Sequence, residues 1–424
     1  MRLPGVIFNI NNEFAKNVLT VMTGTLLAQA IPIAFMPIMT RVFTPEDFGL
    51  FALYGAIVAI LGVVSTGRYE IAIMLPKEDE DAKTLLHISV LIAFVISLIL
   101  ISPVLLWSSE ISEFLGNPSI GPWLYLVPLS VLLTGAFNAL TYWNNRKKKF
   151  RNIAISRVNQ SCIQGISQVG FGFTKTSGGL VLGHFIGLLA SVLYLLEKDT
   201  TYKFLIKKYD KKCIREQIRK YRKFPTYGVF GGLCDATAAQ MPIIILSKFY
   251  SSTSTGMFSL TFRVLNIPTS VISSAISQVL FQKIVEMNQS TPYKIKAYII
   301  KIFFLLLMIY SPAIPVLAIW GESIFSFIFG EEWRQAGLYS QYLVLAVAVR
   351  FAVSPLSAVL ALERNIKKGV FWQALYICTI TVTLCYASDF PVEEFIVAYV
   401  IHEVILYSIY LVFILQGSAE LTKQ

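Results

Sequence analysis

The chain has 424 residues, of which 55% are hydrophobic and 14% are charged, against roughly 45–50% and about 25% in soluble domains. Its mean hydropathy is +0.64. These values exclude a string of two or three soluble domains. About twelve segments of ~20 residues, each able to cross a hydrocarbon layer of ~30 Å, would use most of the chain. We therefore predict an all-α polytopic membrane protein.

The formal charge of +11 does not indicate a nucleic-acid partner, because the basic residues lie in short stretches between apolar runs. The five cysteines lack the spacing of metal ligands. There is no Gly-Lys pair anywhere, which excludes a phosphate-binding loop and a built-in ATPase. We expect neither a metal nor an organic cofactor.

The apolar runs predict twelve spans. A spanning helix satisfies its own backbone hydrogen bonds, so no strands are expected. The fifth span is the most polar of the set. The predicted spans are 18–39, 49–66, 85–107, 122–141, 153–173, 178–196, 228–247, 256–281, 297–320, 341–361, 370–387 and 394–415.

The distribution of Lys and Arg predicts the orientation. Of the 36 basic residues, 28 lie on one side of the predicted spans, four on the other and four inside spans. The side rich in Lys and Arg normally faces the cytoplasm, so we expect both termini there. The longest basic stretch, 197–227, has Ile214 and Ile218 at helical spacing. It predicts an amphipathic helix on the membrane surface, with a solvated basic linker as the alternative.

The two halves of the chain resemble each other. Gly49-Leu50-Phe51-Ala52-Leu53 has a counterpart 207 residues later in Gly256-Met257-Phe258-Ser259-Leu260. Six spans per half return the chain to its starting side, so the repeats are parallel and related by a pseudo-twofold along the membrane normal. We predict an N-terminal six-helix lobe (1–196), a basic cytoplasmic linker (197–227) and a C-terminal six-helix lobe (228–424).

Polar residues inside the spans are the candidate site, since burying them in lipid is costly and they normally face a bundle interior or a wet cavity. They form three stripes at helical spacing, each headed by an arginine. We predict a water-filled cationic cavity that binds substrate, and the alternative is interhelical hydrogen bonding with snorkelling arginines. The guanidinium fork suits phosphate or carboxylate. The residues are Arg157, Gln160, Gln164 and Gln168 in the fifth span, Arg263, Asn266 and Ser270 in the eighth, and Arg350 and Ser354 in the tenth.

Acids and histidines inside the spans are fewer. Asp235, in the seventh span, predicts either an ion-coupling site for H⁺ or Na⁺ or a structural pair with an arginine. Glu403, in the last span, is interpreted mainly as structural. The histidines, among them His184 and His402, have no second ligand at metal spacing and are interpreted as helix-packing residues.

Three sequence motifs carry a family resemblance. They lie between the first two spans, at the end of the second, and before the fifth. They are Phe43-Thr44-Pro45-Glu46-Asp47-Phe48-Gly49, Arg68-Tyr69-Glu70 and Asn145-Arg146-Lys147-Lys148-Lys149-Phe150. With them, the chain resembles the Wzx-type O-antigen and polysaccharide flippases of the multidrug/oligosaccharidyl-lipid/polysaccharide exporter superfamily.

The resemblance implies a two-lobed transporter with alternating access and no enzymatic activity. Its cargo would be an undecaprenyl-diphosphate-linked oligosaccharide, moved from the cytoplasmic to the periplasmic leaflet of the bacterial inner membrane. We expect a proton or sodium gradient to drive it. The expected partners are the lipid-linked oligosaccharide, the phospholipid bilayer and other membrane proteins of polysaccharide assembly.

Other functions fit the sequence less well. A multidrug or cation antiporter of the same superfamily would favour acids in the cavity, and the first span, 18–39, contains none. A peptidoglycan-precursor flippase usually carries two further spans, for which the chain has no room. A membrane polysaccharide polymerase or ligase needs a large periplasmic catalytic loop, and the longest one expected here is 321–340.

Overall fold

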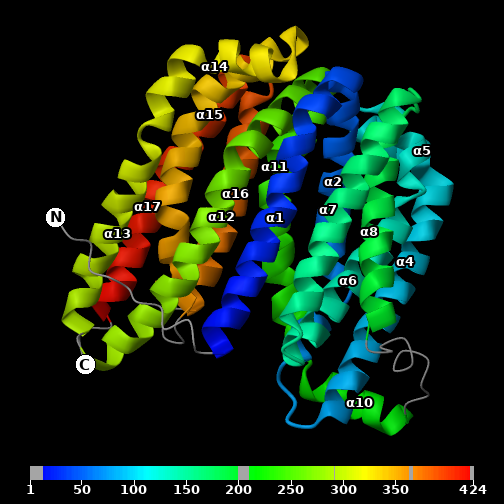
Figure 1. The fold of residues 1–424 in the computed structure, drawn as a ribbon, viewed down its shortest axis with the longest axis vertical. Coiled ribbons are helices and arrows are strands. Elements are labelled where there is room, and N and C mark those ends of the chain that lie inside the picture. The colour runs from blue at the N-terminus through cyan, green and yellow to red at the C-terminus, as the bar shows by residue number, and fades with distance from the viewer. Residues whose placement is uncertain (1–12, 199–209, 291, 362–365, 421–424) are drawn as a thin grey trace.

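A computed structural model describes residues 13–198, 210–290, 292–361 and 366–420. Over these residues the chain is almost entirely helical and has no strand, which confirms the predicted all-α fold (Figure 1). The helices are α1 (Glu13–Val42), α2 (Pro45–Val64), α3 (Tyr69–Ala72), α4 (Asp79–Phe114), α5 (Gly121–Leu124), α6 (Val127–Arg146), α7 (Phe150–Phe173), α8 (Gly179–Glu197), α10 (Lys211–Lys220), α11 (Val229–Phe249), α12 (Ser252–Ser290), α13 (Ile295–Tyr310), α14 (Ala313–Phe329), α15 (Arg334–Val353), α16 (Ile366–Ala387) and α17 (Val392–Glu420).

Each predicted span falls on one of these helices or on a helix pair. Within the described residues, eight helical segments are long and apolar enough to cross a membrane, and the bent pair Pro118–Leu124 and Val127–Arg146 makes a ninth. The other three predicted spans fall on α7, α12 and α16. Two of these, α7 and α12, are helices whose polar stripes lower their hydropathy.

The helices pack into two bundles (Figure 1). The first contains α1, α2, α4, α6, α7 and α8, and the second contains α11 to α17. Helix α10 lies across one end of the first bundle, which we call the α10 end; the turn between α14 and α15 lies at the opposite end. A 3₁₀ segment, Ser354–Ala361, continues α15.

Two expectations about connections need correction. The predicted loop 321–340 is mostly helical, because α14 runs to Phe329 and α15 begins at Arg334; the chain breaks instead near Pro312, between α13 and α14. Within the predicted linker 197–227, residues 199–209 lie outside the described residues. In the part that is described, Ile214 of α10 packs against the first bundle. Ile214 therefore contacts protein, whereas Ile218, one turn further along α10, is 39% exposed.

The motif between α1 and α2 is a helix start. Thr44 caps α2: its hydroxyl accepts a hydrogen bond from the Asp47 N–H (3.3 Å), and the Asp47 carboxylate accepts one from the Thr44 N–H (3.1 Å). Pro45 occupies the first turn of the helix, where its missing N–H has no cost. This capping box orients α2 where it meets the second bundle.

At the end of the molecule opposite α10, the first turns of α2 and α12 cross in near backbone contact. A Cβ on Gly49 would overlap the backbone carbonyl of Ser252, and a Cβ on Gly256 would overlap that of Pro45. At the 207-residue offset of the repeat, Ser252 corresponds to Pro45 and Gly256 corresponds to Gly49. The two halves therefore make equivalent contacts with each other. Glycine at both positions is what permits this approach.

Hydrogen bonds between the bundles close the same end. Asn117 Nδ2 donates to Ser252 Oγ (2.9 Å), Ser247 Oγ donates to the Leu115 carbonyl (3.1 Å), and the buried Trp333 indole donates to the Thr40 carbonyl (3.0 Å). The structure is therefore closed between the bundles at the end opposite α10.

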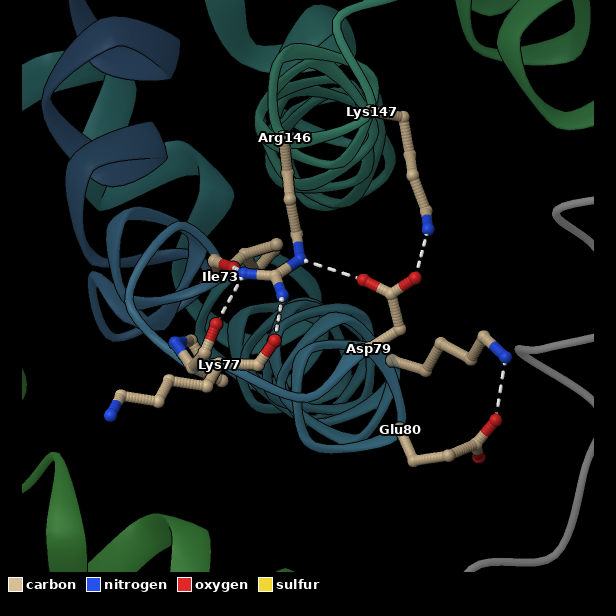
Figure 2. A network of polar contacts seen from close by, with 8 residues as sticks. Ile73, Lys77, Asp79, Glu80, Arg146 and Lys147 are labelled. Carbon is tan, nitrogen blue, oxygen red and sulfur yellow. Dashed lines mark hydrogen bonds and ion pairs between the residues drawn. The ribbon is translucent and has the colours of Figure 1, made fainter.

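Arg146, in the basic motif after α6, joins three segments at the α10 end (Figure 2). Its guanidinium donates to the carbonyls of Ile73 (3.2 Å), Pro76 (2.7 Å) and Lys77 (3.3 Å), and to Asp79 Oδ1 (3.2 Å). Lys147 pairs with the other oxygen of Asp79. One planar fork thus satisfies the carbonyls of the α3–α4 connection and fixes the start of α4.

Arg146→Ala is expected to lower the free energy of unfolding by about 2–3 kcal/mol, since charged hydrogen bonds contribute roughly 1.5–3 kcal/mol each and are not additive. Arg146→Lys should recover only part of this loss, because an ammonium cannot reach the same acceptors together. Thermal unfolding in detergent measures the effect. Arg151→Ala, at an exposed position on α7, is the control; equal losses in both variants would contradict this interpretation of Arg146.

Candidate functional site

The polar stripe of α7 faces α1 and α8 inside the first bundle. Arg157 Nη1 donates to Thr25 Oγ1 of α1 (2.8 Å), and Gln164 Oε1 lies 3.3 Å from His184 Nδ1 of α8. Gln168 is buried and donates to the Leu180 carbonyl (2.8 Å). The stripe therefore serves partly to hold α1 and α8 together, with Gln168 fully engaged in that role. Gln160, on the same stripe, is half-buried.

A small pocket lies where this stripe meets the second bundle. Its apolar wall comes from α1, α2 and α8, and its polar wall from α7. The second bundle contributes Arg263 of α12. Of the predicted site residues, Gln164, Gln168 and Arg263 line this pocket, and the other predicted residues do not. Its lining is Pro32, Met36, Met39, Phe48, Phe51, Ser161, Gln164, Gly165, Gln168, Leu180 and Arg263.

Arg263 is a half-buried cation without an acidic partner. Its guanidinium lies 5.2 Å from the centre of the Phe51 ring, and it acts electrostatically on His184. Among the described residues, no carboxylate lies within ion-pair distance of Arg263 or of Arg157. A cation placed at membrane depth without a counter-charge provides a site for an anionic ligand.

The other stripe residues of α12 and α15 are placed differently. Asn266 Nδ2 donates to the Phe262 carbonyl of its own helix (2.8 Å). Ser270 is exposed and donates to Gln29 Oε1 of α1 (3.3 Å), across the bundle interface. Ser354 is the first residue of the 3₁₀ segment. None of these three residues lines the pocket.

Arg350, unlike the other two arginines, has a counter-charge. Its Nη1 lies 4.0 Å from Glu403 Oε2 of α17. The guanidinium also lies 5.9 Å from the ring centres of Phe262 and Tyr407. The three predicted arginines therefore divide into two unpaired cations, Arg157 and Arg263, and one cation compensated within the second bundle.

Asp235 is exposed on α11 and accepts a hydrogen bond from Gln373 Nε2 of α16 (2.8 Å). One turn earlier on α11, Gly232 packs against the Arg68 side chain of the first bundle: a Cβ there would lie 2.8 Å from Arg68 Cζ. No arginine within the described residues forms an ion pair with Asp235. Its hydrogen-bond partner is an amide, and the guanidinium of Arg68 is a nearby cation.

The Arg68-Tyr69-Glu70 motif forms a second contact between the bundles, at the α10 end. Arg68 has a left-handed backbone (φ 61°), uncommon for a residue with a Cβ, and its Nη1 lies 3.8 Å from Glu70 Oε1. Glu70 is buried and accepts a hydrogen bond from the Thr66 hydroxyl. Burial raises the pKa of the Glu70 carboxyl above its usual value.

Two groups emerge that the sequence interpretation underrated. His184 lies beside Gln164 and Arg263, and Glu403 lies beside Arg350, although both were assigned to packing. Nothing in the sequence pattern indicates this position for His184. For Glu403 one existed: an acid in the last span with Tyr376 and Arg350 on neighbouring spans.

The fold is that of the superfamily of multidrug, oligosaccharidyl-lipid and polysaccharide exporters. Two solved structures share it. A lipid II flippase, MurJ, in an inward closed conformation has a TM-score of 0.73 at 14% identity, covering 95% of this chain and 90% of that chain. An inward-facing multidrug resistance transporter of the MATE family has a TM-score of 0.71 at 12% identity, covering 95% and 96%.

Within this superfamily the chain belongs to the polysaccharide biosynthesis protein family, whose model matches residues 38–337. Two relatives agree. The succinoglycan biosynthesis transport protein ExoT of Rhizobium meliloti is 22% identical over 80% of this chain and 67% of its own length. The lipopolysaccharide biosynthesis protein WzxC of Escherichia coli is 20% identical over 85% and 73%. The protein is thus a multi-pass membrane transporter of polysaccharide biosynthesis.

Proposed function

We propose that this protein flips an undecaprenyl-diphosphate-linked oligosaccharide from the cytoplasmic to the periplasmic leaflet of the bacterial inner membrane. The observation that carries the proposal is a pair of arginines without acidic partners. Arg263 lines the pocket where the bundles meet, and Arg157 lies on the polar stripe of α7, hydrogen-bonded to Thr25 of α1. A diphosphate-sugar headgroup needs fixed positive charge and many hydrogen-bond partners to leave water.

The direction follows from the charge distribution. The α10 end carries most of the basic residues, so the positive-inside rule assigns it to the cytoplasm, together with both termini. Separation of the bundles at the α10 end, where Arg68 packs against Gly232, would admit cargo from the cytoplasm while the other end stays closed. Opening of that closed end would then release the headgroup to the periplasm.

A multidrug or cation antiporter of the same superfamily is the alternative. It is disfavoured because the charged group that lines the pocket is an arginine, with no carboxylate in the lining. A cationic drug would be repelled from such a site.

Deleting the gene in its host tests the proposal. The lipid-linked oligosaccharide should then accumulate on the cytoplasmic leaflet, and the chain supplied in trans should restore it to the periplasmic leaflet. Accumulation on the periplasmic leaflet, or no accumulation, would exclude the flippase function.

Thiol labelling tests the cavity itself. After removal of the native cysteines, single cysteines at Gln164, Ser270 and Ser354 should react with a small water-soluble reagent, and lipid-linked cargo should protect them. Cysteines at Ile272 and Leu345 are the controls; both side chains are exposed on the surface of the chain, where lipid covers them. Equal labelling of the two sets would mean that the stripes are packing surfaces.

We further propose that Asp235 binds the coupling proton or sodium ion. Its exposed carboxylate, held by the Gln373 amide, is accessible from the space between the bundles. Asp235→Asn should keep cargo binding but reduce transport several-fold and remove its response to an ion gradient in proteoliposomes. Gln373→Glu, which restores a carboxylate nearby, should recover part of the response. Transport by the Asn variant that still follows the gradient would return Asp235 to a structural role.

A further inference from the structure

The interior of the second bundle holds a carboxylate that is only partly satisfied. Glu403 of α17 is 1% exposed. Its Oε1 accepts a hydrogen bond from the Tyr376 hydroxyl of α16 (2.5 Å) and lies 3.5 Å from His402 Nδ1. Its Oε2 has no hydrogen-bond partner, nor does His402 Nδ1. Such a buried carboxylate is costly while it is ionised.

Arg350 of α15 is the cation that offsets this charge. The Nη1–Oε2 distance of 4.0 Å is an ion pair without a hydrogen bond. The guanidinium side chain is 32% exposed, whereas that of Glu403 is 1% exposed, so Arg350 lies between the buried acid and an accessible space.

The remaining groups around Glu403 cannot replace Arg350. Besides Tyr376 of α16, the titratable neighbours are His402, Tyr399 and Tyr407 of its own helix. His402 Nε2 contacts Thr379 Oγ1 (3.1 Å). If an anion between the bundles attracts the Arg350 guanidinium, Glu403 loses the one permanent counter-charge that the described residues place beside it. Protonation is then the way left to remove the buried charge.

We propose that Glu403 is a proton-binding site coupled to the binding of an anion at Arg350. The proton comes from water and adds to the carboxylate, and no other bond changes. Because linkage is reciprocal, lower pH should favour anion binding as much as the anion favours proton uptake. The inference deepens the proposed function, since the anion would be the diphosphate of the cargo. It also differs from the Asp235 proposal, which concerns the coupling ion.

Proton uptake on ligand binding tests the coupling. Titration of the purified full-length protein with geranyl diphosphate, by calorimetry in buffers of different ionisation heat, gives the protons taken up per ligand bound. Because the diphosphate can itself exchange protons on binding, the test compares the number of protons taken up by wild-type with the number taken up by each variant. Wild-type should exceed Glu403→Gln by close to one proton, and the affinity of the Gln variant should depend less on pH. Glu70→Gln, at another buried acid, is the matched control and should keep the wild-type uptake. Equal uptake by wild-type and Glu403→Gln would overturn the proposal.

A second measurement needs no ligand. In Arg350→Ala, Glu403 has lost its counter-charge, so the infrared carbonyl band of a protonated carboxyl should appear near neutral pH. It should be absent in wild-type and in the double variant Arg350→Ala/Glu403→Gln, and should persist in Arg350→Ala/Asp235→Asn. If the wild-type protein does not bind geranyl diphosphate but Arg350→Ala shows this band, the result contradicts a diphosphate cargo and supports Glu403 as a proton-binding site. Absence of the band in Arg350→Ala would overturn the proton site.

Discussion

Replacing Gly256 by alanine is expected to reduce transport about tenfold or more and to lower thermal stability markedly. The new methyl group would overlap the Pro45 carbonyl and approach the Gly49 nitrogen to 2.9 Å. These are backbone atoms, which cannot move aside as a flexible side chain can, so α2 and α12 must separate. Overpacking commonly costs about 1–3 kcal/mol, and each ~1.4 kcal/mol corresponds to a factor of ten.

The control for this substitution is Gly55→Ala in α2, where a Cβ would meet nothing within 4 Å. That variant should be as stable as wild-type or slightly more so, since alanine is the better helix former. Surface polysaccharide in a complemented deletion strain gives the transport readout, and thermal unfolding in detergent gives stability. If Gly256→Ala matches Gly55→Ala in surface polysaccharide and thermal stability, the close crossing of the two helices is not needed for transport.

Arg263→Ala is expected to abolish surface polysaccharide while the protein remains in the membrane at near-normal level. A charged hydrogen bond contributes roughly 1.5–3 kcal/mol, so cargo flipping in proteoliposomes should fall about 10- to 100-fold. Arg263→Lys should recover only part of the activity, since a point charge loses bidentate geometry. The loss follows from removing an unpaired cation, not from breaking an ion pair.

Arg334→Ala provides the comparison. Arg334 pairs with Glu331 at the surface, at the end opposite α10, and is 55% exposed. Exposed pairs contribute little, so this variant should transport like wild-type. Normal polysaccharide from Arg263→Ala would exclude Arg263 as a cargo contact.

The helices were predictable from the sequence because their signals are local. Apolar runs located the spans, and the Thr44–Asp47 capping box and Pro45 mark the start of α2. The helical break near Pro312 was missed, because 297–320 is an unbroken apolar run whose second half continues in α14. Hydropathy reports membrane depth and says little about where a helix bends.

The candidate site was predictable only in part. The stripes of α7 and α12 placed Gln164 and Arg263 correctly on helices that meet at one pocket. What each polar group contacts depends on packing between distant segments, which periodicity does not encode. Gln168 thus donates to the Leu180 carbonyl, and Arg350 lies beside Glu403 rather than in the pocket.

The position of the crossing between α2 and α12 also determines how far the end of each helix moves when the two helices rotate against each other. The helices touch at Gly49 and Gly256, near their N-terminal ends. From there, at ~1.5 Å per residue, α2 extends about 23 Å to Val64 and α12 about 51 Å to Ser290. A rotation of about 10° at the crossing displaces the far end of α12 by about 9 Å and that of α2 by about 4 Å. A small angular change at a two-glycine contact therefore suffices to move the opposite end by the width of a helix. A shorter α12 would move its far end by a proportionally smaller distance.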